Sequence, residues 1–171
     1  YQSVSGTGKN AIDQLYSERN GSNSEKIYPY SIDQNLLPHC DVFEEDGYTK
    51  EENKLINETK KILNDNSIQI TSTAVRVPIE ICHGESVNIE FEKEYKLEEV
   101  NSILKSSTGL IVEDEPKDNL YPMPINAANK DEVFVGRIRR DFSVKSGLNL
   151  WIVADNPVSY THLRAHETLT D

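Results

Sequence analysis

Residues 73–86, with the sequence TAVRVPIEICHGES, constrain the fold of this chain more than any other segment. Arg76 lies inside this segment, and His83 lies near its end. A β-branched residue occupies every second position, which predicts a β-strand with one buried face. These residues are Val75, Val77, Ile79 and Ile81. Because a buried strand seldom carries a guanidinium, Arg76 and His83 are candidates for a functional site.

The spacing of Arg76 and His83 limits how they could act together. An unbroken strand would direct them to opposite faces and separate them by about 23 Å. If they serve one site, the chain must bend between them, and Pro78 and Gly84 are the natural positions for a bend. Arginine offers a planar fork of donors that matches a carboxylate, and histidine suits proton transfer near neutral pH. The alternative is an edge-strand arginine and an exposed loop histidine without a shared role.

Composition excludes several classes of protein. The 171 residues, of which 36% are hydrophobic, suffice for one domain of ordinary size. The net charge of −11 argues against nucleic acids and anionic membrane surfaces as partners. The sequence contains no apolar run near the roughly 20 residues that cross a membrane, and it shows no signal peptide. Cys40 and Cys82 have no metal-ligand spacing, so we expect a cytoplasmic protein without a metal site.

Periodicity predicts helices and strands in alternation. Thr49 and Glu52 form a capping-box pattern that opens a helix ending near Leu63. Further helices are expected near residues 10–19 and 97–105. Strands are expected at residues 67–72, 73–81, 87–91, 109–112, 132–141 and 148–155. This alternation indicates an α/β or α+β layer rather than a helical bundle.

Four phrases in the sequence carry a resemblance to one enzyme family. They are YQSVSG at residues 1–6, EENK at residues 51–54, RVP followed by HGE in residues 76–85, and KDEVFVGRIRRD with GLNLWIVADN in residues 130–156. Together they resemble aspartate-semialdehyde dehydrogenase over about residues 1–156. The resemblance implies an α+β fold of the type found in the C-terminal domain of glyceraldehyde-phosphate-dehydrogenase-like enzymes. Such a fold has a mixed, largely antiparallel sheet with helices packed on one face.

The resemblance also implies roles for individual residues. His83 would be the catalytic acid/base, and Arg76 would hold the α-carboxylate of the substrate. Gln2 would contact the substrate, Glu51 would bind its amino group, and Lys54 would bind the phosphate. These pairings are sound electrostatically, although Glu51 and Lys54 could equally form a solvated salt bridge one helical turn apart.

The nicotinamide cofactor, expected to be NADP, would contact Ser5, Gly6 and Asn156. The implied reaction is the reductive dephosphorylation of 4-phospho-L-aspartate to L-aspartate 4-semialdehyde through a cysteine thioester. This step belongs to the biosynthesis of lysine (through diaminopimelate), threonine and methionine. The family also implies a homodimer or homotetramer.

The departures from the family matter as much as the matches. The dinucleotide-binding fold and the nucleophilic cysteine are expected upstream of Tyr1, so we interpret the chain as a fragment that is inactive alone. Cys82 is expected to be a compact core residue, because neighbouring strand residues point to opposite faces and it would face away from His83. Residues 157–171 show no clear period, and we interpret them as an artefactual tail outside the family domain of residues 1–156.

The sequence leaves two alternatives open. The chain could derive from another acyl-phosphate reductase, such as N-acetyl-glutamyl-phosphate reductase. It could also be a catalytically silent relative that serves as a dimerising module.

Overall fold

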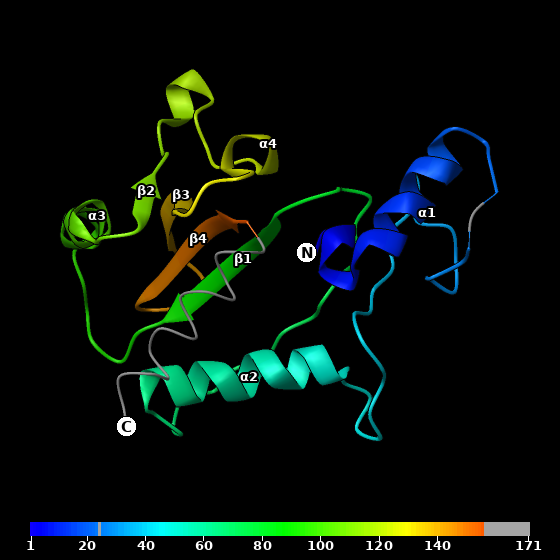
Figure 1. The fold of residues 1–171 in the computed structure, drawn as a ribbon. Coiled ribbons are helices and arrows are strands. Elements are labelled where there is room, and N and C mark those ends of the chain that lie inside the picture. Colours follow the sequence, from blue (N-terminus) through cyan, green and yellow to red (C-terminus); the bar gives the residue numbers. More distant parts are fainter. Residues whose placement is uncertain (24, 156–171) are drawn as a thin grey trace, which may run out of the picture. The chain divides into compact units, whose positions relative to one another are not determined.

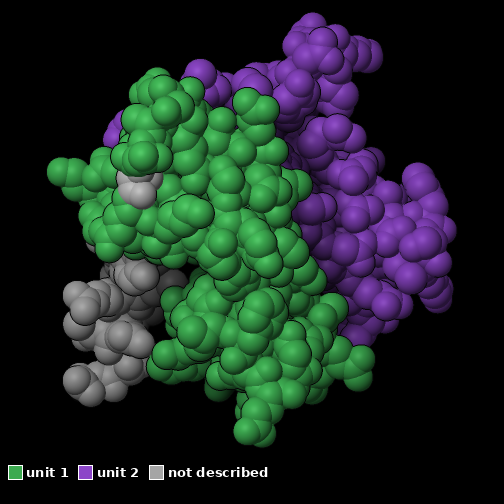
Figure 2. All heavy atoms as spheres, turned by 90° about the vertical axis from the view of Figure 1, so that its right-hand side faces the viewer, with its two compact units in different colours: residues 1–80 green, residues 81–171 purple. Residues whose placement is uncertain are grey.

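The computed structural model describes residues 1–23 and 25–155, and its contacts divide the chain into two compact units, residues 1–80 and 81–171 (Figure 2). Figure 1 traces the elements of both units. The first unit contains η1 (Val4–Thr7), α1 (Lys9–Arg19) and α2 (Lys50–Leu63). The second unit contains β1 (His83–Glu90), α3 (Leu97–Ser106), β2 (Leu110–Val112), η2 (Pro116–Asp118), α4 (Pro124–Ala127), β3 (Val133–Asp141) and β4 (Gly147–Ala154).

The core of the first unit forms between α1 and the long connection that follows it. Ala11 and Leu15 lie four residues apart on α1 and are fully buried, as the helical period requires. They pack with Val4 of η1 and with residues of the connection, namely Tyr28, Ile32 and Leu37. The buried amide oxygen of Gln14 accepts the backbone N–H groups of residues 27 and 28. This contact supplies partners that a connection without regular structure cannot supply itself.

Helix α2 begins with the predicted capping box. The Thr49 side chain accepts the Glu52 N–H, and the Glu52 carboxylate accepts the Thr49 N–H at 2.8 Å. The helix ends at Asn64, which adopts the left-handed conformation (φ 50°) that commonly terminates helices. The predicted helix and its bounds are therefore confirmed.

The second unit is built on a four-stranded mixed sheet in the order β1-β4-β3-β2 (Figure 1). Strand β4 pairs antiparallel with β1 and β3, whereas β2 pairs parallel with β3. One face of the sheet packs against α3 in a cluster that includes Val135, Leu148 and Leu150. The opposite face buries Phe134 and Val153 with Ala127 of α4. The α+β fold class predicted from the sequence is confirmed.

Two predicted strands do not form. Residues 67–72 have no strand pairing, and residues 73–81 have only isolated bridges at Arg76. Within residues 73–81, Ala74 and Arg76 are buried while the β-branched residues are half-buried, so the predicted buried face was wrong. Alternation describes a strand only where a partner strand runs alongside it, and here the available partners are single short segments.

The chain does bend between Arg76 and His83, but not at both predicted positions. The Ile79 N–H donates to the Val77 carbonyl at 2.8 Å and closes a three-residue turn around Pro78, whose fixed φ suits that geometry. Cys82 then adopts a positive φ of 73°, immediately before β1 begins. Gly84 lies inside β1 opposite Val153, so the prediction of a bend at Gly84 was wrong.

Candidate functional site

Arg76 is the buried cation of the first unit, with 5% of its surface exposed. Its backbone exchanges two hydrogen bonds with Leu37, at 2.8 and 3.0 Å. Its Nη1 donates to the Ser3 carbonyl at 2.6 Å, and its Cζ lies 5.9 Å from the centroid of the Tyr28 ring. Its buried Nε has no hydrogen-bond partner within the described residues. A buried donor without a partner is costly, so this guanidinium is suited to receive an anionic acceptor.

Glu51 and Lys54 lie on the first two turns of α2, and the side chain of Gln2 lies beside Glu51. The Gln2 Nε2 donates to Glu51 Oε1 at 2.7 Å, and the Lys54 Nζ lies 3.9 Å from Glu51 Oε2. The Lys54 ion pair is long and partly exposed, so its contribution to stability is small. One carboxylate, one ammonium and one amide are therefore gathered where an amino acid could meet all three.

The first residues of the chain bring these groups to Arg76. Gln2 forms a parallel bridge with Arg76, because its N–H donates to the Val75 carbonyl and its carbonyl accepts the Val77 N–H. The side chain of the same residue reaches Glu51. The structure therefore places four predicted site residues, Gln2, Glu51, Lys54 and Arg76, in one region of the first unit.

The turn predicted to contact the cofactor is η1. The Ser5 N–H donates to the Glu80 carbonyl at 3.0 Å, and the Ser5 Oγ lies 3.0 Å from the Ser3 Oγ. Ser5 is half-buried, whereas Gly6 is exposed. An exposed glycine lets a flat ring approach the backbone closely, and the contact of Ser5 and Gly6 with a cofactor stays a prediction.

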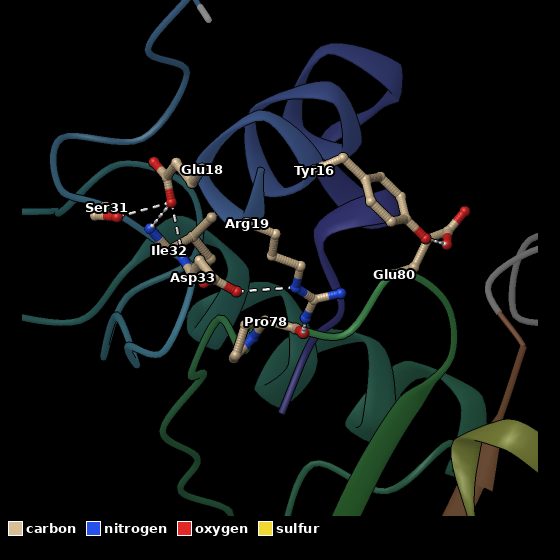
Figure 3. Close-up of polar contacts among 8 residues, drawn as sticks. All are labelled: Tyr16, Glu18, Arg19, Ser31, Ile32, Asp33, Pro78 and Glu80. Carbon is tan, nitrogen blue, oxygen red and sulfur yellow. Dashed lines mark hydrogen bonds and ion pairs between the residues drawn. The ribbon is translucent and has the colours of Figure 1, made fainter. Parts of the chain in front are cut away.

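Helix α1 anchors the segment that follows Arg76, as Figure 3 shows. The Arg19 guanidinium donates to the Asp33 carboxylate at 2.8 Å and to the Pro78 carbonyl at 2.6 Å. The Tyr16 hydroxyl donates to the Glu80 carboxylate, and this hydrogen bond raises the pKa of Tyr16. The turn around Pro78 is therefore held from outside the site by two side chains of one helix.

His83 belongs to the second unit, where it is the first residue of β1 and lies opposite Ala154 of β4. By strand alternation it shares a sheet face with Val87 and Ile89, which pack in the cluster with α3. Asn156 lies outside the described residues. The convergence of Arg76 and His83 on one substrate stays a prediction.

Neither cysteine of the chain has the properties of a nucleophile. Cys82 is fully buried beside Phe134 and Val153, which confirms its predicted place in the core. Burial, reinforced by the nearby charge of Asp155, raises the pKa of the Cys82 thiol to about 11. Burial also raises the pKa of Cys40. Because the thiolate is the reactive form, both residues are poor nucleophiles at neutral pH.

Alkylation tests this conclusion about the two thiols. In the native protein at pH 8, we expect iodoacetamide to leave Cys40 and Cys82 largely unmodified, while both react in urea. Peptide mass spectrometry distinguishes the two positions from any other cysteine of a longer protein. The raised pKa of Cys82 stabilises the folded state below pH 9, and this contribution falls as the pH rises towards 11. Rapid native alkylation of either residue at pH 8 would contradict the assignment.

Two contacts in this region were not predicted from the sequence. The Tyr28 ring lies against Arg76, and the Ala74 N–H donates to the Glu52 carboxylate at 2.8 Å. The capping box identified Glu52 only as a helix start, and no local signal linked it to a residue 22 positions away.

The arrangement belongs to a recognised class of protein domain. The sequence model of the semialdehyde dehydrogenase dimerisation domain matches residues 1–159. The chain therefore belongs to this family, which confirms the family resemblance stated from the sequence.

Several relatives of the chain are named aspartate-semialdehyde dehydrogenase. The chain is 49% identical to the enzyme of Aquifex aeolicus (strain VF5) and 43% identical to that of Bacillus subtilis (strain 168), with 91% of the chain covered in each case. Its structure is similar to that of aspartate semialdehyde dehydrogenase II from Vibrio cholerae, with a TM-score of 0.84, 41% identity and 91% of the chain covered. The same Vibrio cholerae enzyme has been solved in complex with ASA, again with a TM-score of 0.84 and 41% identity.

The chain spans about half the length of the relatives it matches, namely 48% of the Aquifex aeolicus enzyme, 49% of the Bacillus subtilis enzyme and 48% of the first Vibrio cholerae chain. Among the described residues, none of the helices is long and apolar enough to cross a membrane. The same residues contain no group of three or more histidine, cysteine, aspartate or glutamate side chains that could hold a metal ion.

Proposed function

We propose that this chain is the substrate-binding and dimerisation part of an NADP-dependent aspartate-semialdehyde dehydrogenase. The complete enzyme converts 4-phospho-L-aspartate to L-aspartate 4-semialdehyde and phosphate in the cytoplasm, as a homodimer or homotetramer. The product feeds the synthesis of lysine, threonine and methionine.

One observation carries the proposal. Gln2, Glu51, Lys54 and Arg76 lie together in the first unit, and the buried Nε of Arg76 lacks a partner among the described residues. Their charges complement those of the substrate, which bears one ammonium, one carboxylate and one acyl phosphate. A site of this kind selects an acidic amino acid by matching each charge. The names of the relatives from Aquifex aeolicus and Bacillus subtilis support the same substrate.

Each substrate-binding residue then has a defined role. Arg76 clamps the α-carboxylate through its guanidinium, and Glu51 accepts the α-ammonium. Lys54, whose side chain is 45% exposed and lies 3.9 Å from Glu51, binds the phosphate through its ammonium. Gln2 fixes the Glu51 carboxylate and contacts the substrate. Orientation by such groups can lower a reaction barrier by several kcal/mol.

His83 is proposed as the acid/base that moves the proton on the attacking sulfur or on the hemithioacetal oxygen. The nucleophile that forms the thioester is a cysteine from the half of the relatives that this chain does not match. The burial of Cys40 and Cys82 supports this assignment. NADPH supplies the reducing equivalents to the acyl carbon. Ser5 and Gly6 of η1, with Asn156, would hold its nicotinamide.

A substrate panel tests the proposal. We expect the full-length protein to reduce NADP in the presence of aspartate semialdehyde and phosphate, which is the reaction in reverse, and the 171-residue chain alone to be inactive. Preference for N-acetyl-glutamate semialdehyde would identify the protein as the other acyl-phosphate reductase. A full-length protein that is inactive with both would be a silent dimerising relative. Turnover by the short chain alone would contradict its role as a partial enzyme.

A further inference from the structure

Glu52 makes a contact that its role as a helix cap does not explain. Its side chain is buried, with 6% of the residue exposed, and both carboxylate oxygens are used. Oε2 accepts the Thr49 N–H at 2.8 Å and completes the capping box. Oε1 accepts the Ala74 N–H, also at 2.8 Å. The second bond leaves the helix and reaches the segment that carries Arg76 two residues later.

We propose that Glu52 is a positioning residue for the substrate site, because its carboxylate holds the first turn of α2 against the segment that carries Arg76. The inference rests on the proposed function. In that function, Glu51, the neighbour of Glu52, binds the α-ammonium of the substrate, and Arg76 binds its α-carboxylate. The distance between them therefore decides whether both can engage one substrate.

Two sets of contacts link the start of α2, which carries Glu51, to the segment that carries Arg76. On one side, the Gln2 side chain binds Glu51, and the Gln2 backbone pairs with the segment on both sides of Arg76. On the other side, the Glu52 carboxylate binds the Ala74 N–H. Without the bond of the Glu52 carboxylate, the two elements would keep the Gln2 contact and the weak 3.4 Å bond from the Ser72 hydroxyl to the Glu52 carbonyl. Neither of these contacts holds Ala74, so Glu51 could shift relative to Arg76.

A matched pair of variants separates positioning from capping. Glutamine is accepted at the third helical position of a capping box. Its side chain has only one acceptor oxygen, however, whereas the Thr49 N–H and the Ala74 N–H each donate to a separate oxygen of Glu52. The Glu52→Gln variant can keep the helix cap only by losing the bond to Ala74. Thr49→Ala removes the hydroxyl that accepts the Glu52 N–H at 3.3 Å, and it leaves both bonds of the Glu52 carboxylate in place.

The experiment measures steady-state kinetics of the full-length enzyme with aspartate semialdehyde, phosphate and NADP. For Glu52→Gln we expect KM for aspartate semialdehyde to rise about tenfold, as loss of a hydrogen bond to a charged group implies, and KM for NADP to stay within about twofold. For Thr49→Ala both KM values are expected to stay within about twofold of the wild type. Ala74→Pro removes the N–H donor while keeping the capping box, and it should reproduce the selective rise.

Three outcomes would overturn the inference. They are an unchanged KM for aspartate semialdehyde in Glu52→Gln, an equal rise in Thr49→Ala, and a Glu52→Gln protein that fails to fold while Thr49→Ala folds. The last two would assign Glu52 to the stability of the first unit alone. A wild-type protein that does not turn over aspartate semialdehyde would instead contradict the proposed function, so the two failures are distinguishable.

Discussion

Arg76→Lys is expected to lower kcat/KM of the full-length enzyme for aspartate semialdehyde by about a hundredfold, equivalent to about 2.7 kcal/mol. Lysine can replace the donor that Nη1 offers to the Ser3 carbonyl. It cannot reproduce the planar fork that includes Nε, which lacks a partner among the described residues and is available to a second acceptor oxygen. Most of the loss should appear in KM for the amino-acid substrate if Arg76 holds the α-carboxylate in both the ground state and the transition state.

Arg139→Lys provides the control for the same chemical exchange. Arg139 is exposed in β3, and its guanidinium donates to the carbonyl of its neighbour Arg137. We expect its kinetics to stay within about twofold of the wild type. Circular dichroism should show that both variants are folded. Near-normal kinetics for Arg76→Lys would remove Arg76 from the substrate site.

Gly136→Ala is expected to destabilise the protein by about 3 kcal/mol or more, at the upper end of what overpacking costs. A Cβ at this position of β3 would lie 2.1 Å from the Glu113 carbonyl oxygen and 2.5 Å from Cδ of Pro122. The Glu113 N–H donates to the Val135 carbonyl, and the Pro122 carbonyl accepts the Trp151 indole N–H. Both neighbours are therefore held in place, so relief of the clash requires the parallel pairing of β2 with β3 to shift.

Gly109→Ala is the matched control for Gly136→Ala. Gly109 has a positive φ of 78°, and a Cβ there would meet nothing within 4 Å. We expect this variant to lose only about 1 kcal/mol, the usual cost of a side chain in the left-handed region. Urea unfolding of the three proteins measures the difference. Equal stability of Gly136→Ala and the wild type would show that the strands can separate at no cost.

Local pattern was sufficient to predict the elements whose stability is local or which pair over many residues. The capping box at Thr49 and Glu52, the helix α3 and the strands β3 and β4 were all predicted. Each has a repeated signal, because a helix repeats every 3.6 residues and a paired strand repeats every two. The family was predicted for a different reason, namely that several short phrases match its motifs together.

Residues 73–81 show where pattern failed. Their alternation predicted a strand, but the segment forms only bridges to Gln2 and Leu37. The residues that it buries are Ala74 and Arg76, rather than the β-branched ones. A buried guanidinium contradicts the hydrophobic pattern, and its partners, the Ser3 carbonyl oxygen and the Tyr28 ring, come from distant segments.

The sequence by itself determined the helices α1, α2 and α3, the strands of the sheet, the family and the chemical types of the candidate site residues. Only the tertiary structure decided which of these residues meet. It brought Gln2 and the start of α2 to Arg76, and it gave Glu52 a second partner at Ala74. The reason is that periodicity reports contacts within one element. Hydrogen bonds between segments tens of residues apart depend on the tertiary fold, which a local repeat does not predict.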